Sequence, residues 1–153
     1  MSAAPETTPA VAARGLRKTY GTLAAVAGVD VTVQPGDVYG YLGPNGAGKT
    51  TSLRMMLGLI RPTAGEVLLF GRDPMLDPVS ALDGVAGFVE DPAFYPYLSG
   101  RANLELLADL DGGGNAAGVA EVLEIVELSG RAGDRVRGYS HGMRQRLGLA
   151  AAL

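Results

Sequence analysis

The sequence contains no cysteine, and this absence excludes disulfide bonds and metal sites built from thiolates. It has no excess of positive charge either, because 13 lysine and arginine residues stand against 16 aspartate and glutamate residues. The net charge of −3 argues against nucleic acid as the main partner, since phosphates need basic side chains to neutralise them. No run of eighteen or more apolar residues occurs, so we expect no segment to span a bilayer.

The first ten residues, 1–10, lack the basic start and the apolar stretch of a secretory signal. They are small, polar and proline-containing, so we expect a disordered tail. The remaining chain is long enough for one domain with a hydrophobic core. Its apolar fraction of 47% is typical of a folded globular protein.

Four segments of the first 90 residues have the patterns of strands. The valines of 29–33 alternate with polar residues and predict a half-buried strand. The short apolar run 38–42 predicts a buried strand, and 66–70 and 85–89 predict two more.

One helix is predicted directly after the predicted strand 38–42 and the loop that follows it, and three more are predicted in the second half of the chain. Thr50–Ile60 has helical periodicity, with Leu53, Met56, Leu57 and Ile60 on one apolar stripe. Ser99 can cap a helix that runs to Leu110, and Val119–Val126 and the stretch after Ser140 predict two more helices. Strands around a glycine-rich loop, followed by helices, indicate an α/β domain with a helical insertion.

A glycine-rich loop ending in lysine and threonine lies between the predicted strand 38–42 and the predicted helix. Such a loop turns several backbone N–H groups into one concavity, because glycine tolerates positive φ angles and close approach. The helix that follows adds the positive end of its dipole. The spacing therefore predicts a phosphate-binding loop (P-loop) for a nucleotide triphosphate, most simply ATP. Its residues are Gly43, Pro44, Asn45, Gly46, Ala47, Gly48, Lys49 and Thr50.

The last two residues of this loop and the residue after it have distinct expected roles. Lys49 supplies a full positive charge to the β- and γ-phosphates, and this makes it a catalytic candidate. The hydroxyl of Thr50 is a candidate ligand for Mg²⁺, and we expect Thr51 to contact the nucleotide as well. The loop alone leaves kinases, GTPases, helicases and transporter ATPases open.

Further segments resemble one family, the ATP-binding cassette (ABC) subunits of membrane transporters. The segment 17–21 resembles the part of that family that carries an adenine-stacking aromatic ring, and Tyr20 holds that place. The segment 61–67 resembles the turn and strand that follow the loop helix. The resemblance covers about residues 11–153, in the family's order. It implies a P-loop NTPase core of the ABC type, with an N-terminal antiparallel β part and a helical subdomain.

The segment 87–99 resembles the loop that joins the family's catalytic core to its helical subdomain. Most of the family has glutamine where this chain has Glu90, and the glutamate is similar to a subset of drug- and peptide-resistance exporters. The resemblance makes Glu90 a catalytic and metal-binding candidate, since a carboxylate can approach Mg²⁺ or a water. It also implies that the aromatic residues Phe94, Tyr95 and Tyr97 lie near the surface that docks a membrane partner.

The segment 139–146 resembles the family signature, usually Leu-Ser-Gly-Gly-Gln, with departures at Tyr139, His141 and Met143. Ser140 and Gly142 hold matching positions at the start of a helix, where a hydroxyl and a glycine can make a second anion site. In the family this site binds the γ-phosphate of ATP held by the opposite subunit. The resemblance therefore implies a head-to-tail dimer, and a plain serine N-cap is the alternative for Ser140.

The sequence lacks two parts that hydrolysis needs in this family, an Asp-Glu pair after an apolar strand beyond the signature and a later histidine. The last residues, 147–153, are apolar and have no helix stop signal. We therefore expect a chain truncated before the second acidic (Walker B) strand, inactive alone. There is one alternative. The predicted strand 85–89 is followed by the acidic residues Glu90 and Asp91, and if these formed the metal site, the protein would be a compact phosphotransferase.

The sequence predicts four regions: the tail 1–10, an ATP-binding core 11–90, a connecting loop and helical subdomain 91–139, and the signature helix 140–153. The resemblance implies an ABC-type ATPase that binds ATP and Mg²⁺. Its partners would be a second, identical ATP-binding subunit and a membrane-spanning permease, with no nucleic acid. It would lie at the cytoplasmic face of the cell membrane and drive transport, most simply export. The alternative is a non-transport ABC ATPase that acts as a clamp on ribosomes or DNA.

Overall fold

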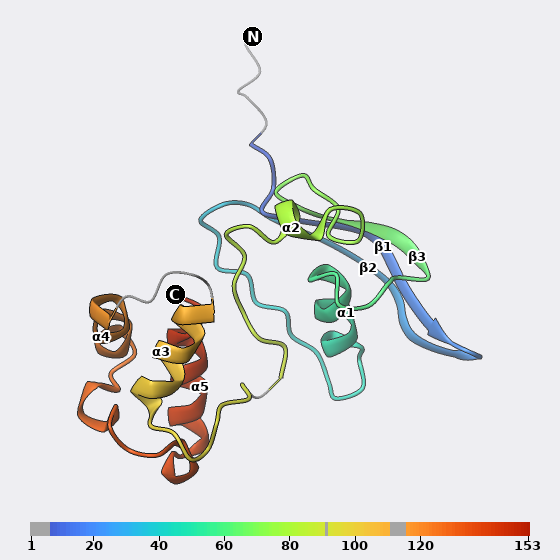
Figure 1. Ribbon diagram of the computed structural model, residues 1–153. Helices are drawn as coiled ribbons and strands as arrows, with labels where there is room; N and C mark the ends of the chain where they lie inside the picture. The colour runs from blue at the N-terminus through green and yellow to red at the C-terminus, as the bar shows by residue number, and fades with distance from the viewer. Residues whose placement is uncertain (1–6, 91, 111–115) are drawn as a thin grey trace. The chain divides into compact units, whose positions relative to one another are not determined.

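The structure is a computed structural model that describes residues 7–90, 92–110 and 116–153. The chain forms two compact units, Met1–Val85 and Ala86–Leu153 (Figure 1). Six residues of the expected tail, 1–6, lie outside the described residues. Of the remaining four, the Thr7 hydroxyl donates to Oε1 of Gln34 over 3.4 Å. The domain boundaries expected at residues 10, 90 and 139 stay predictions.

The first unit is built on an antiparallel sheet of three strands in the order β2-β1-β3 (Figure 1). The strands are β1 (Val11–Tyr20), β2 (Leu23–Val33) and β3 (Ala64–Leu69). Ala13 of the central strand pairs with Val31 on one side and Val67 on the other, and all three are buried. The alternation of valines before residue 34 therefore correctly predicted a half-buried strand.

Helix α1 (Lys49–Met56) packs on this sheet through Met55 and Met56, and Ser52 is buried as well. The prediction that the helix runs to Ile60 is wrong, because α1 ends at Met56. Leu53, on the predicted apolar stripe, is 37% exposed. The helix ends early because Gly58 has a φ of +70°, the left-handed conformation that closes helices. The Leu59 N–H then donates back to the Arg54 carbonyl over 2.8 Å.

The strands predicted at 38–42 and 85–89 are not formed, and this part of the sequence interpretation is wrong. Val38 and Leu42 are more than nine-tenths exposed. A strand exists only where a neighbour completes its ladder of backbone hydrogen bonds. No described segment pairs with either run, so both stay irregular. The compact phosphotransferase alternative loses its basis, since it required an acidic residue at the end of a strand 85–89.

The second unit consists of helices, and the three helices predicted from the sequence are present. They are α3 (Gly100–Leu110), α4 (Ala116–Ile125) and α5 (His141–Ala150), and the short 3₁₀ turns η1 (Ser129–Arg131) and η2 (Val136–Gly138) lie between α4 and α5. Ser99 caps α3 as predicted, because its hydroxyl accepts from the Ala102 N–H over 3.1 Å. The core residues are Leu104, Val119, Leu123, Val126, Leu128, Ala132, Val136, Tyr139, Leu147 and Ala150.

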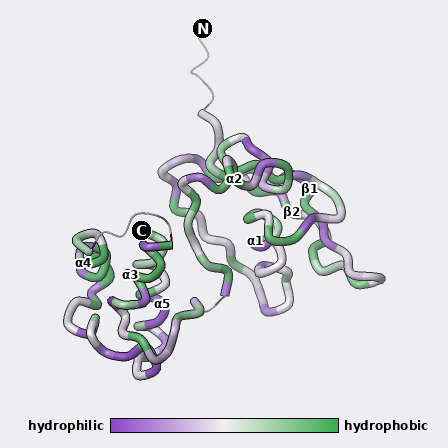
Figure 2. Tube along the Cα trace, in the orientation of Figure 1, coloured by the Kyte–Doolittle hydropathy of each residue, from purple (hydrophilic) through white to green (hydrophobic). Residues whose placement is uncertain are grey.

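Hydrophobic and hydrophilic residues are mixed along α3 and α4, as in helices with one buried face (Figure 2). In the described part of the chain, no helix has the length and apolar character needed to cross a membrane. The short helix α2 (Pro78–Ala81), which the sequence did not predict, belongs to the first unit and is capped by Asp77.

Candidate nucleotide-binding site

The glycine-rich loop ends where α1 begins, against strand β2. Its last glycine, Gly48, has a φ of +82° and forms the N-cap of the helix. A Cβ atom at this position would lie 2.3 Å from the Ala25 carbonyl oxygen and 2.9 Å from the Val26 side chain. Glycine is therefore required here both for the backbone angle and for the close contact with β2, and this contact fixes the end of the loop on the sheet.

The ammonium group of Lys49 lies over the loop. Its Nζ donates to the carbonyl oxygens of Gly43, over 2.5 Å, and Pro44, over 2.7 Å. The Ala47 N–H also donates to Pro44, over 3.2 Å, and closes a tight turn. These bonds hold one full positive charge beside the backbone of the loop, which is the arrangement that a bound phosphate needs.

The start of α1 adds a second source of positive potential. The N–H groups of Lys49, Thr50 and Thr51 have no acceptor within the helix, because they belong to its first turn. That turn has no acidic side chain to compete with an anion. Ser52 is buried and donates its hydroxyl back to the Gly48 carbonyl over 3.0 Å, whereas Thr50 is exposed. The loop and the helix start can together bind the oxygens of a phosphate chain.

Tyr20, the last residue of β1, lies in the same unit and is 52% exposed. The Lys18 ammonium lies 5.1 Å from the centroid of its ring and donates to the Arg61 carbonyl over 2.6 Å. Tyr20 pairs with Leu23 across the hairpin, three residues from Val26, which contacts Gly48. At about 3.3 Å per residue, Tyr20 is about 10 Å along the strand from the loop.

The other three candidate residues belong to the second unit. Glu90 is exposed and follows the irregular segment 85–89. Ser140 is the N-cap of α5, and its hydroxyl accepts from the Met143 N–H over 3.2 Å. Gly142 is exposed in the first turn, with no atom within 4 Å of where its Cβ would lie. The structure thus groups Tyr20 and the loop in one unit, and Glu90, Ser140 and Gly142 in the other.

Sequence reasoning missed the structural importance of Asn103, which is only 2% exposed in α3. Its side chain accepts from the Tyr95 N–H over 2.8 Å and donates to the carbonyls of Tyr95 (3.1 Å) and Ser99 (2.9 Å). Asn103 therefore fixes the aromatic segment that follows Glu90 to the helix. Helical periodicity gave no signal for it, because a polar residue on a helix is expected to face solvent.

Tyr139, at the first position of the signature-like segment, is 3% exposed. Its hydroxyl donates to the Arg131 carbonyl over 2.7 Å. Burial raises the pKa of this phenol above its ordinary value, and the nearby Asp134 carboxylate raises the pKa further. The sequence marked Tyr139 only as a departure from the usual leucine.

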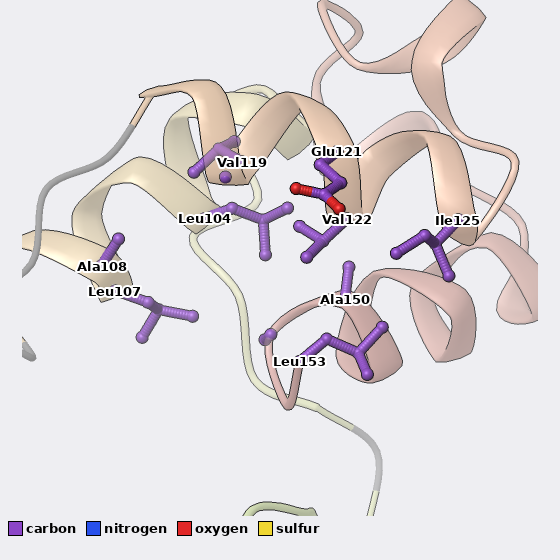
Figure 3. Close-up of a pocket in the computed structure, with 11 residues that line it drawn as sticks. Leu104, Leu107, Ala108, Val119, Glu121, Val122, Ile125, Ala150 and Leu153 are labelled. Atoms are coloured by element: carbon purple, nitrogen blue, oxygen red, sulfur yellow. The ribbon is translucent and has the colours of Figure 1, made fainter.

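The second unit also contains a pocket of about 450 Å³ between α3, α4 and the end of α5 (Figure 3). Its lining is apolar apart from Glu121, whose carboxylate is seen beside Val122 in Figure 3. A negative side chain among apolar ones is unsuited to a phosphate chain. In the described part of the chain, no three acidic or histidine side chains gather to hold a metal ion.

Comparison with known proteins gives consistent results. The chain is 44% identical over 138 residues to the bacitracin transport ATP-binding protein BcrA of Bacillus licheniformis, covering 90% of this chain and 45% of the relative. It is 40% identical over 147 residues to the daunorubicin resistance ATP-binding protein DrrA3 of Streptomyces coeruleorubidus, covering 94% and 46%. The chain thus spans about half the length of the curated relatives it matches.

The fold has a counterpart among solved structures, described as the structure of an ATP-binding subunit of an ABC transporter. The TM-score is 0.77 at 25% sequence identity, over 93% of this chain and 60% of that one. This confirms the predicted fold class, an ABC-type ATPase fold with an antiparallel β part and a helical subdomain. The family model described as ABC transporter matches residues 26–153, which include the loop, Glu90 and the signature-like segment. The chain belongs to the ABC transporter family, and its relatives are ATP-binding proteins of the resistance and export type.

Proposed function

We propose that the protein is the ATP-binding subunit of an ABC transporter, which couples binding and hydrolysis of ATP to transport by a separate membrane subunit. The observation that carries this proposal is the loop itself, with Gly48 fixed against β2 and Lys49 bonded across the loop. Family membership supports the reaction and the nucleotide.

The residues of the loop fit ATP. Backbone N–H groups, the Lys49 ammonium and the start of α1 are donors and positive charges, and phosphate oxygens are acceptors. Tyr20 is exposed on the same unit and has a ring face to stack on a base. We propose Thr50 as the protein ligand of Mg²⁺, which when bound neutralises part of the phosphate charge, and Glu90 as a second candidate.

The signature-like segment supports a role in a dimer. Ser140 and Gly142 are exposed at the start of α5, where the first N–H groups of the helix face solvent or a ligand. We propose that they bind the γ-phosphate of ATP held by a second copy of the subunit, in a head-to-tail dimer. The observed N-cap bond of Ser140 is compatible with this, because a hydroxyl oxygen can accept one bond while its hydrogen donates another.

The membrane partner would dock on the aromatic segment after Glu90. Tyr95 and Tyr97 are 59% and 76% exposed, and a pocket of about 390 Å³ lies between this segment and α3. Exposed aromatic rings beside a groove are typical of protein interaction sites. The proposal places the subunit at the cytoplasmic face of the membrane, with a permease as its partner. The names of the relatives, bacitracin transport and daunorubicin resistance, favour export.

For the polypeptide of residues 1–153 by itself, we propose nucleotide binding without turnover. Hydrolysis in this family needs a group that positions the attacking water and a second metal ligand on the side of the metal opposite the loop. In this sequence Glu90 is the candidate for such a group, and residues 1–153 contain neither the Asp-Glu pair after the signature-like segment nor a later histidine.

The proposal is tested by finding whether a multi-span membrane protein is encoded beside the subunit, co-expressing it with the subunit as encoded (the full gene product), and purifying the pair in detergent. We expect the two to co-purify, with ATP hydrolysis that Lys49→Ala removes and the exposed charge change Arg72→Ala leaves unchanged. Co-purification with ribosomes or DNA, with no membrane partner, would instead identify a clamp and contradict the transport proposal.

A further inference from the structure

Tyr139 precedes Ser140 directly and is buried in the core of the second unit. Its ring occupies the space beside Gly100, the first residue of α3. A Cβ atom on residue 100 would lie 2.3 Å from the Tyr139 hydroxyl oxygen and 3.1 Å from the ring carbon that carries it. The start of α3 is therefore shaped to accept this ring, and any larger residue at position 100 would displace it.

Both the side chain and the backbone of Tyr139 are held by hydrogen bonds. The hydroxyl donates to the carbonyl of Arg131 in η1 over 2.7 Å. The Tyr139 carbonyl accepts from Nη1 of Arg144 in α5 over 2.5 Å. One residue thus joins the start of α3, η1 and α5, and it does so next to the N-cap of α5.

The segment before Tyr139 is held at the same place. The Gly100 N–H donates to the Asp134 carbonyl over 3.2 Å, and the Val136 N–H donates to the Leu98 carbonyl over 3.0 Å. The backbone therefore reaches Tyr139 along a fixed path. After Tyr139 the chain exposes Ser140, whose φ and ψ of −65° and 166° are those of a helix N-cap.

We propose that Tyr139 is a positioning residue that fixes where Ser140 presents its hydroxyl and where the first N–H groups of α5 point. This inference rests on the proposed function, in which these groups bind the γ-phosphate of ATP held by the second subunit. Such contacts lose strength when donors move by about half an ångström, so the anchoring of Tyr139 governs the site without touching the nucleotide. The leucine usual at this position in the family has no hydroxyl to bond Arg131.

The test is a double-mutant cycle in the subunit as encoded, with the dissociation constant of the dimer measured by sedimentation in a non-hydrolysable ATP analogue. Tyr139→Phe keeps the ring and removes the bond to Arg131. We expect it to weaken the dimer about three- to tenfold, the effect of one hydrogen bond. Ser140→Ala weakens the dimer by itself. In the Ser140→Ala background the effect of Tyr139→Phe is expected to be smaller, because the part that acts through the Ser140 hydroxyl is absent and only the part that acts through the N–H groups of α5 remains.

A control and a second variant separate positioning from folding. Tyr39→Phe, on a half-exposed tyrosine of the first unit, leaves the dimer constant unchanged. Gly100→Ala pushes on the same ring, and we expect it to weaken the dimer less when Tyr139→Phe has removed the closest contact. Amide exchange at Met143, whose N–H is capped by Ser140, speeds up in Tyr139→Phe and not in Tyr39→Phe.

The outcomes are distinguishable. If Ser140→Ala leaves the dimer constant unchanged, the proposed role of Ser140 in the dimer is wrong, and the Met143 amide alone decides whether Tyr139 positions α5. If Ser140→Ala weakens the dimer but Tyr139→Phe has no effect, or the same effect in both backgrounds, Tyr139 does not position Ser140. Unchanged amide exchange at Met143 in Tyr139→Phe likewise overturns the inference.

Discussion

Gly48 lies so close to Ala25 that a Cβ atom on residue 48 would be 2.3 Å from the Ala25 carbonyl oxygen. Gly46, two residues earlier, has a similar φ of +84° but open space around it. Substitution of Gly46 would therefore cost only the strain of a positive φ angle, whereas substitution of Gly48 would add a steric clash with β2. The end of the phosphate loop is fixed by its close contact with β2 and not by the backbone angle alone.

The first prediction follows from this pair. Gly46→Ala should lower the free energy of unfolding by about 1 to 2 kcal/mol, the usual cost of a left-handed conformation for an L residue. Gly48→Ala should lower it by clearly more, because the backbone of β2 must also move. Urea unfolding of the two variants measures both values. Equal values would mean that the loop does not rest on β2.

The second prediction concerns the pH dependence of stability. The folded-state pKa of Tyr139 is raised, so its neutral form is favoured in the fold. Its contribution to stability is complete below the ordinary phenol pKa of 10.0 and is lost as the pH rises through the folded pKa. Tyr139→Phe should therefore lose less stability than the wild type between pH 9.5 and 11, as measured by urea unfolding; these limits bracket the usual phenol pKa of about 10.

Tyr39→Phe is the matched control for this titration, since it removes a half-exposed phenol. It should keep the loss of stability that we expect of the wild type in this pH range. If Tyr39→Phe and Tyr139→Phe behaved alike, the buried hydroxyl of Tyr139 would not be linked to folding.

The third prediction concerns Glu90. If this residue occupies the family's loop position, Glu90→Gln should leave the nucleotide dissociation constant within about twofold and retain measurable hydrolysis, because an amide oxygen still serves as a ligand. Steady-state turnover of the subunit as encoded, beside Glu90→Ala, measures this. A fall of about a hundredfold or more in Glu90→Gln, to the level of Glu90→Ala, would indicate a charged metal ligand and contradict the prediction.

The parts of the fold that depend on local pattern were predictable from the sequence. Ser99 and Ser140 marked the starts of two helices because a serine hydroxyl satisfies the first N–H groups. The runs 38–42 and 85–89 have the composition of strands, yet neither forms one, because a strand also needs a neighbour. The composition of one segment cannot show whether a second segment is available to pair with it.

The same distinction applies to the candidate site. The loop was predictable because spacing of glycines and a lysine encodes its geometry locally. The interactions of Asn103 and Tyr139 were not, since their partners Tyr95 and Arg131 come close only in the folded unit. Buried hydrogen bonds of this kind leave no periodic trace in a sequence.

The most direct test of the account is the affinity for nucleotide, because every other proposal depends on the loop. Titration of the subunit as encoded with a fluorescent ATP analogue should show binding that Lys49→Ala weakens about ten- to hundredfold, the effect of removing a charged donor. The control Arg72→Ala removes an exposed charge of the same unit and should leave the dissociation constant unchanged. An affinity that is the same in wild type and Lys49→Ala would contradict the assignment of the loop as the triphosphate site.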